Sequence, residues 1–70
     1  MKAEEIRALS AEEIRSRLEE TREELMNLRF QQATGELVDF NQLRRTRRLI
    51  ARLLTILKER EQEAAVEGEK

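Results

Sequence analysis

A seam of mostly apolar positions runs through the first half of the chain at alternating steps of four and three residues. Its members are Ile14, Leu18, Thr21, Leu25, Leu28 and Gln32. This spacing is typical of an α-helix that packs along one narrow line against a partner helix. Ser10 and Glu13 precede the seam with the spacing of a capping box, in which each side chain accepts the backbone amide of the other residue. We therefore predict a helix that begins after Ser10 and ends before Gly35, the residue expected in the left-handed conformation after the last turn.

A second, wider apolar face follows a short connection. Its members are Leu43, Thr46, Ile50, Leu53, Leu54 and Leu57. Asp39 has the chemistry of an N-cap, and Gln42 stands where its capping-box partner would be. We predict that the second helix runs from about Phe40 to about Gln62.

Two helices of this length joined by a few residues predict an all-α fold, a long antiparallel two-helix hairpin preceded by a short helical turn at residues 2–8. We expect one hairpin domain over residues 1–63 and an acidic tail over residues 64–70 that frays because it loses the periodicity. Each helix would then have a single partner. The narrow seam of the first helix is expected to leave part of the wider face for something outside the hairpin, at the marginal positions Leu49, Leu54 and Ile56.

Charge is segregated along the chain although the net charge is only −1. Residues 26–58 carry seven basic and two acidic side chains, and no acid occurs from residue 40 to residue 58. Five arginines fall on the side of the second helix away from its apolar face: Arg44, Arg45, Arg47, Arg48 and Arg52. Guanidinium groups bind phosphate oxygens well, so this arrangement predicts contact with a nucleic-acid backbone.

The alternatives to that contact are a solvated surface, a membrane surface and an acidic protein partner. No aromatic residue is interleaved with the arginines, which favours backbone contact with structured RNA or a duplex over stacking on single strands. Near the connection, Phe30 either folds over the turn onto residues 37–40 or points outward as a docking site. In the outward arrangement its polar neighbours would contact RNA: Arg29, Gln31 and Thr34.

Several functions are excluded by what the chain lacks. It contains no Cys and no His, so it has neither a disulfide nor the commonest metal ligands and general base. Neighbouring glutamates such as Glu12 and Glu13 diverge by about 100° on a helix and form a solvated face. We expect no enzyme activity, cofactor, metal or small-molecule substrate. No signal peptide or membrane-spanning run is evident, which fits a cytoplasmic protein.

Three blocks of the chain resemble the bacterial large-subunit ribosomal protein twenty-nine family, and together they cover roughly residues 1–60. They are Met1-Lys2-Ala3-Glu4-Glu5-Ile6-Arg7 with Ser10-Ala11-Glu12-Glu13, then residues 25–37, with the core Leu28-Arg29-Phe30-Gln31-Gln32-Ala33-Thr34-Gly35, and residues 47–57. The chain departs from the family at Leu49, where an acidic or polar residue is more usual, and at Leu54, where a basic one is. Both changes widen the apolar face.

The resemblance implies a helical hairpin that binds large-subunit ribosomal RNA (rRNA) as a structural constituent of the large ribosomal subunit. It also implies a position at the rim of the polypeptide exit tunnel, beside large-subunit protein twenty-three, where ribosome-associated chaperones and targeting factors bind. It assigns the RNA-facing role to Arg29, Gln31, Thr34, Arg47, Arg48 and Arg52, to which the helical pattern adds Arg44 and Arg45. The alternative from another class is a coiled-coil protein-interaction module that forms a homodimeric four-helix bundle.

Overall fold

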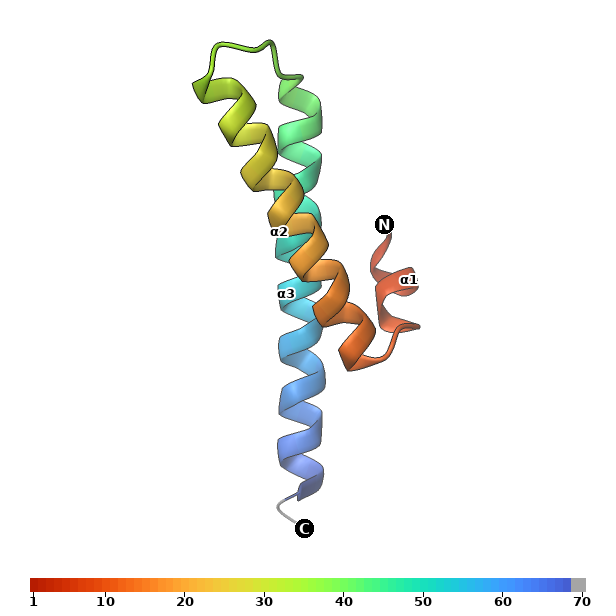
Figure 1. The fold of residues 1–70 in the computed structure, drawn as a ribbon. Coiled ribbons are helices and arrows are strands. Elements are labelled where there is room, and N and C mark those ends of the chain that lie inside the picture. Colours follow the sequence, from red (N-terminus) through yellow and green to blue (C-terminus); the bar gives the residue numbers. More distant parts are fainter. Residues whose placement is uncertain (69–70) are drawn as a thin grey trace.

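The computed structural model describes residues 1–68 and contains three helices, α1 (Ala3–Arg7), α2 (Ala11–Ala33) and α3 (Phe40–Gly68). Figure 1 shows α2 and α3 as an antiparallel hairpin with α1 beside it, in a molecule that measures 54 × 19 × 14 Å. We call the end at the α2–α3 connection the turn end. We call the part where α1 packs beside the start of α2 and the middle of α3 the open end, and α3 extends beyond it toward the C-terminus. The described residues contain no strand, and the predicted all-α hairpin with a short N-terminal helix is confirmed.

Local signals at residues 10 and 35 set the two ends of α2. The Glu13 amide donates to the Ser10 hydroxyl at 3.2 Å, as predicted, and that hydroxyl donates to the Glu13 carboxylate at 3.1 Å. The carboxylate is therefore bound by the Ser10 hydroxyl rather than by the Ser10 amide. At the other end Gly35 has a φ of +86°. Its amide and that of Glu36 donate to the carbonyls of Gln32 and Gln31 at 3.2 and 3.0 Å, which completes a Schellman motif.

The start of α3 is as predicted, but its end is not. The Asp39 carboxylate accepts the Asn41 amide at 2.9 Å, so Asp39 caps the helix. The predicted end near Gln62 is wrong, because α3 continues to Gly68. Ala64 and Ala65 are strong helix formers, and loss of apolar periodicity alone does not end a helix. Residues 69–70 of the expected tail lie outside the described residues.

The hydrophobic core lies at the open end and draws on all three helices. It consists of Ile6, Ile14, Leu18, Leu53, Ile56 and Leu57. The expectation that α3 has a single partner is wrong, because α1 also packs on α3 and contributes Ile6, which is fully buried. Ile56 is therefore buried and Leu49 half-buried, although both were expected at an uncovered margin. Leu54, on the opposite margin of α3, is still 41% exposed.

Polar groups of α3 hold both ends of α1. The Arg52 guanidinium donates to the Met1 carbonyl at 2.9 Å, and the Arg60 guanidinium donates to the Arg7 carbonyl. Arg7 also pairs with Glu59 at 3.7 Å. Exposed interactions of this kind contribute only about 0–1 kcal/mol each, whereas full burial of an isoleucine contributes about 1.5–3 kcal/mol. Ile6 is therefore the main reason that α1 docks, and the polar contacts fix its position.

Packing is thinner at the turn end. Leu28 in the seam of α2 and Leu43 near the start of α3 are buried, whereas Leu25 is half-buried and Gln32 is exposed. The buried Thr46 hydroxyl donates to the Gln42 carbonyl of its own helix at 2.8 Å, so it needs no partner on α2. Three large apolar side chains at this end are exposed: Phe30, Leu37 and Phe40.

Candidate nucleic-acid interface

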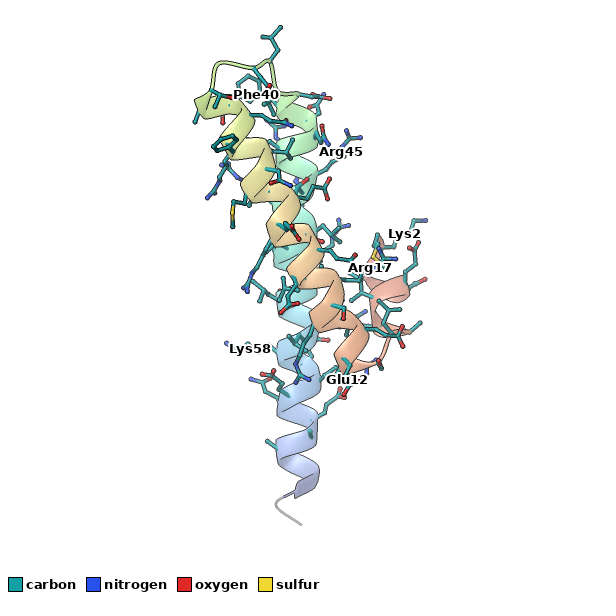
Figure 2. The ribbon with its side chains drawn as sticks, in the orientation of Figure 1. Lys2, Glu12, Arg17, Phe40, Arg45 and Lys58 are labelled. Atoms are coloured by element: carbon teal, nitrogen blue, oxygen red, sulfur yellow. The ribbon has the colours of Figure 1, made fainter. Side chains whose placement is uncertain are left out.

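The outer surface of α3 between the turn end and the middle of the molecule carries five exposed arginines. They are Arg44, Arg45, Arg47, Arg48 and Arg52, which we call the arginine face. Their exposure follows from the helical period, because Leu43, Thr46 and Leu53 turn the opposite side of α3 toward the other helices. Figure 2 shows Arg45 projecting from α3 near the turn end, on the side of the view where α1 lies.

The positive charge of the arginine face is not neutralised by ion pairs within the described part of the chain. The ion pairs found there are Arg7 with Glu59, Arg15 with Glu61 and Arg17 with Glu20. None of them involves the arginine face or Arg29. An exposed helix with this density of uncompensated guanidinium groups produces a strong local positive potential and attracts polyanions.

Two shallow grooves border the arginine face and share Arg48. The first is lined by Phe40, Leu43, Arg44, Arg47, Arg48 and Ala51. The second is lined by Met1, Glu24, Gln42, Arg45, Thr46, Arg48, Leu49 and Arg52. The first groove combines basic and apolar side chains without an acid, whereas the second includes the carboxylate of Glu24. The arginine face is therefore a basic ridge between two different flanks.

Arg52 differs from the other four members of the arginine face. One of its guanidinium nitrogens donates to the Met1 carbonyl, so the side chain also holds the N-terminus against α3. A guanidinium has five N–H donors, and the remaining donors are able to bind a phosphate. This second role could not be predicted from the sequence, because residues 1 and 52 are brought together only by the docking of α1.

The candidate residues of α2 lie on a different helix from the arginine face. Gln31 lines a groove with Gln42 and with three glutamates, Glu20, Glu23 and Glu24, and both Glu24 and Gln42 also line the second groove beside the arginine face. Thr34 is the C-cap of α2, and its hydroxyl donates to the Gln31 carbonyl at 3.0 Å. Arg29 is exposed. Phe30 is 69% exposed, so the structure shows the outward arrangement rather than packing over the turn.

One residue that lines the first groove was not predicted from the sequence. Phe40 is 71% exposed and lines the first groove with Arg44 and Arg47, although the arginines were thought to lack an aromatic neighbour. The signal was available, because positions i, i+4 and i+7 share one side of a helix. Phe40 lies one turn before the first arginine of the arginine face and not between the arginines.

No group of three His, Cys, Asp or Glu side chains in the described part of the chain is arranged to hold a metal ion. None of the helices in that part of the chain is long and apolar enough to cross a membrane.

Comparison with known proteins identifies the family. The model of the family described as ribosomal L29 protein matches residues 4–60. The large ribosomal subunit protein uL29 of Rubrobacter xylanophilus is 59% identical over 63 residues, which cover 90% of this chain and 94% of the relative. Those of Corynebacterium diphtheriae and Thermosipho africanus are each 54% identical, over 84% and 87% of this chain and 78% and 92% of their own lengths. The chain therefore belongs to the ribosomal L29 family, whose members are structural ribosomal proteins and not enzymes.

Proposed function

We propose that this protein is a structural constituent of the large ribosomal subunit and binds large-subunit rRNA through the arginine face of α3. The observation that carries the proposal is the set of exposed arginines without an ion-pair partner among the described side chains. Because the chain belongs to a ribosomal protein family, we propose rRNA as the nucleic acid that it binds. Because its relatives are proteins of the large ribosomal subunit by name, we propose the rRNA of that subunit.

The proposed mechanism is passive electrostatic binding by a rigid scaffold. The arginines bind rRNA phosphates and release the counterions condensed on them, so affinity falls as salt rises. Arg29 adds a further charge from α2, and Gln31 and Thr34 offer polar contacts beside the turn. The glutamates along α2 repel phosphate, so the acidic flank should face solvent or protein rather than RNA.

The family resemblance also supports a place for the protein in the cell. We infer that it works in the cytoplasmic ribosome, near the polypeptide exit tunnel and beside large-subunit protein twenty-three. Ribosome-associated chaperones or targeting factors would then bind in its neighbourhood. The acidic flank of α2, lined by Glu20, Glu23 and Glu24, is available for such protein contacts.

A double charge reversal, Arg47→Glu with Arg48→Glu, tests the proposal directly. The matched control is Arg22→Glu with Lys58→Glu, which changes the charge by the same amount at exposed positions outside the arginine face and outside the ion pairs of the described residues. Binding to a large-subunit rRNA transcript and to an unrelated structured RNA is measured across a salt titration, and circular dichroism reports the helix content. The arginine-face variant should lose selective binding, and its slope of log affinity against log salt should fall by roughly 2, one for each phosphate contact.

The control should bind nearly as the unaltered chain does, and both variants should keep their helix content. A salt response that is flat in the unaltered chain would contradict a phosphate-dominated interface. Loss of helix content in the arginine-face variant alone would show instead that these arginines are structural.

The homodimeric four-helix bundle is a second candidate. One observation favours it, the exposure of Met26, Phe30 and Leu54 on the hairpin. Docking of α1 weakens it, because α1 packs on the margin of α3 that was expected to need an outside partner. Sedimentation of the purified chain without RNA separates the two, since a stable dimer would favour the bundle.

A further inference from the structure

The first groove beside the arginine face contains an aromatic side chain whose exposure the fold does not explain. Phe40 is the first residue of α3 and is 71% exposed. Phenylalanine is only a moderate helix former, and Asp39 already caps the helix, so the fold gains little from an aromatic residue there. Figure 2 shows Phe40 at the start of α3, beside the connection at the turn end.

The composition of the groove restricts what can occupy it. Its apolar surface comes from Phe40, Leu43 and Ala51, and its charge comes from three arginines. An occupant that suits both is flat and apolar in one part and anionic in another. A nucleotide has this combination, because its base stacks on an aromatic ring while its phosphate binds guanidinium groups.

The bases of a continuous duplex are stacked on one another and offer no free face to a ring on a protein surface. An unpaired base in a bulge or loop offers such a free face, and one phosphate lies on either side of it along the chain. Arg44 and Arg47 are one and two helical turns from Phe40 on the same side of α3, so they are placed to bind phosphates next to a base held on the ring.

We propose that Phe40, Arg44 and Arg47 form a site for one unpaired nucleotide of the rRNA, with the base stacked on the Phe40 ring and the flanking phosphates bound by the two guanidinium groups. This inference rests on the proposed rRNA-binding function and deepens it. It replaces the expectation, drawn from the sequence, of backbone contact alone. The arginine face then supplies most of the affinity, and Phe40 supplies preference for RNA that presents an unstacked base.

The test compares Phe40→Ala with Met26→Ala in the full chain. Met26 is 68% exposed, lies on α2 and does not line the groove, so it controls for the loss of a large exposed apolar side chain. The probe is a transcript of the large-subunit rRNA of Rubrobacter xylanophilus, the source of a relative 59% identical to this chain. Phe40→Ala should weaken binding roughly 5- to 100-fold, the range for loss of one stacked base, and Met26→Ala should leave it unchanged.

Salt dependence separates stacking from charge. Because stacking adds no charge, Phe40→Ala should keep the salt slope of the unaltered chain while its affinity falls. Arg47→Ala should lower that slope by about 1. A fully paired RNA duplex should bind the unaltered chain and Phe40→Ala equally.

A fluorescent variant gives a direct readout of stacking. The chain contains no tryptophan, so Phe40→Trp places a single indole in the groove. Its emission should be quenched when the rRNA transcript binds and unchanged by the fully paired duplex. A tryptophan at the control position, Met26→Trp, should respond to neither RNA.

Each contrary result has a distinct meaning. Selective, salt-sensitive binding that Phe40→Ala leaves intact would overturn the nucleotide site but leave the proposed rRNA-binding function standing. Equal losses for the rRNA transcript and the paired duplex would also overturn the site. A change in sedimentation of Phe40→Ala without RNA would overturn it in favour of a protein contact. Absence of selective rRNA binding by the unaltered chain would overturn both proposals.

Discussion

The two ends of the hairpin are stabilised in different ways. At the open end three helices meet, and Ile6, Ile14 and Leu53 are fully buried. At the turn end only two helices meet, and hydrogen bonds of the Gly35 amide and the Asp39 carboxylate cap the two helix ends that flank the connection. The open end therefore carries most of the apolar burial, whereas the turn end exposes its aromatic side chains to solvent.

Arginine serves different purposes at the two ends. At the open end Arg7 and Arg15 pair with glutamates near the end of α3, and Arg60 donates to a backbone carbonyl of α1. Toward the turn end α3 has no acid from residue 40 to residue 58, so its arginines lack such partners. The neighbouring residues, rather than the residue type, decide whether an arginine serves the fold or an outside ligand.

The largest effect on stability is expected from a truncation in the core at the open end. Leu53→Ala removes a fully buried side chain from the core, and such changes destabilise by about 2–5 kcal/mol. A chain of this size has a net stability of only about 3–5 kcal/mol, so the variant should lose most of its stability at room temperature. Circular dichroism during urea denaturation measures the change in the free energy of unfolding.

The neighbouring residue provides the control. Leu54→Ala removes the same atoms from a side chain that is 41% exposed, and it should cost well under half as much. Equal losses for the two variants would mean that the core is not concentrated where the structure places it.

The next effect tests whether α1 belongs to the core. Ile6→Ala should lower the free energy of unfolding by about 2–3 kcal/mol, because Ile6 is fully buried against the other core residues. Leu37→Ala, an apolar truncation at the exposed connection of the turn end, should change it by less than about 0.5 kcal/mol. If Ile6→Ala is as mild as Leu37→Ala, α1 does not stay docked in solution.

The features that could be predicted from the sequence depend on local chemistry. The start of α2, its C-terminal glycine and the start of α3 each depend on one residue with a specific capping role: Ser10, Gly35 and Asp39. The antiparallel hairpin follows from two long helices and a short connection. The exposure of the arginine face follows from helical periodicity alone.

The features that could not be predicted depend on contacts between distant parts of the chain. Ile6 lies outside any periodic pattern in a helix of five residues, so nothing local shows that it fills the core. The bond from Arg52 to the Met1 carbonyl exists only because that packing occurs. The groove that Gln31 and Gln42 line together likewise depends on which flank of α2 meets which flank of α3.

A smaller effect tests the turn end. Gly35→Ala places a Cβ on a residue with a φ of +86°, where L-residues are strained even though no other atom lies within 4 Å of the added carbon. The cost should be about 1 kcal/mol, which lowers the melting temperature by about 4–8 °C in a chain of this length. Gly35→Asn should cost less, because asparagine tolerates the left-handed conformation. Identical melting temperatures for all three chains would show that the Schellman motif does not limit stability.

The smallest effect concerns Arg52, which both holds the N-terminus at the open end and belongs to the arginine face. Arg52→Gln should lower the free energy of unfolding by about 0.5 kcal/mol, the contribution of one exposed hydrogen bond to the Met1 carbonyl, whereas Arg47→Gln should leave it unchanged. In rRNA binding we expect the opposite order, with Arg47→Gln having the larger effect. Arg47→Gln should lower the salt slope by about 1, and Arg52→Gln by less, because its guanidinium is turned toward the N-terminus. Equal effects of the two variants in both assays would mean that Arg52 is an ordinary member of the arginine face and that α1 is held by Ile6 without its help.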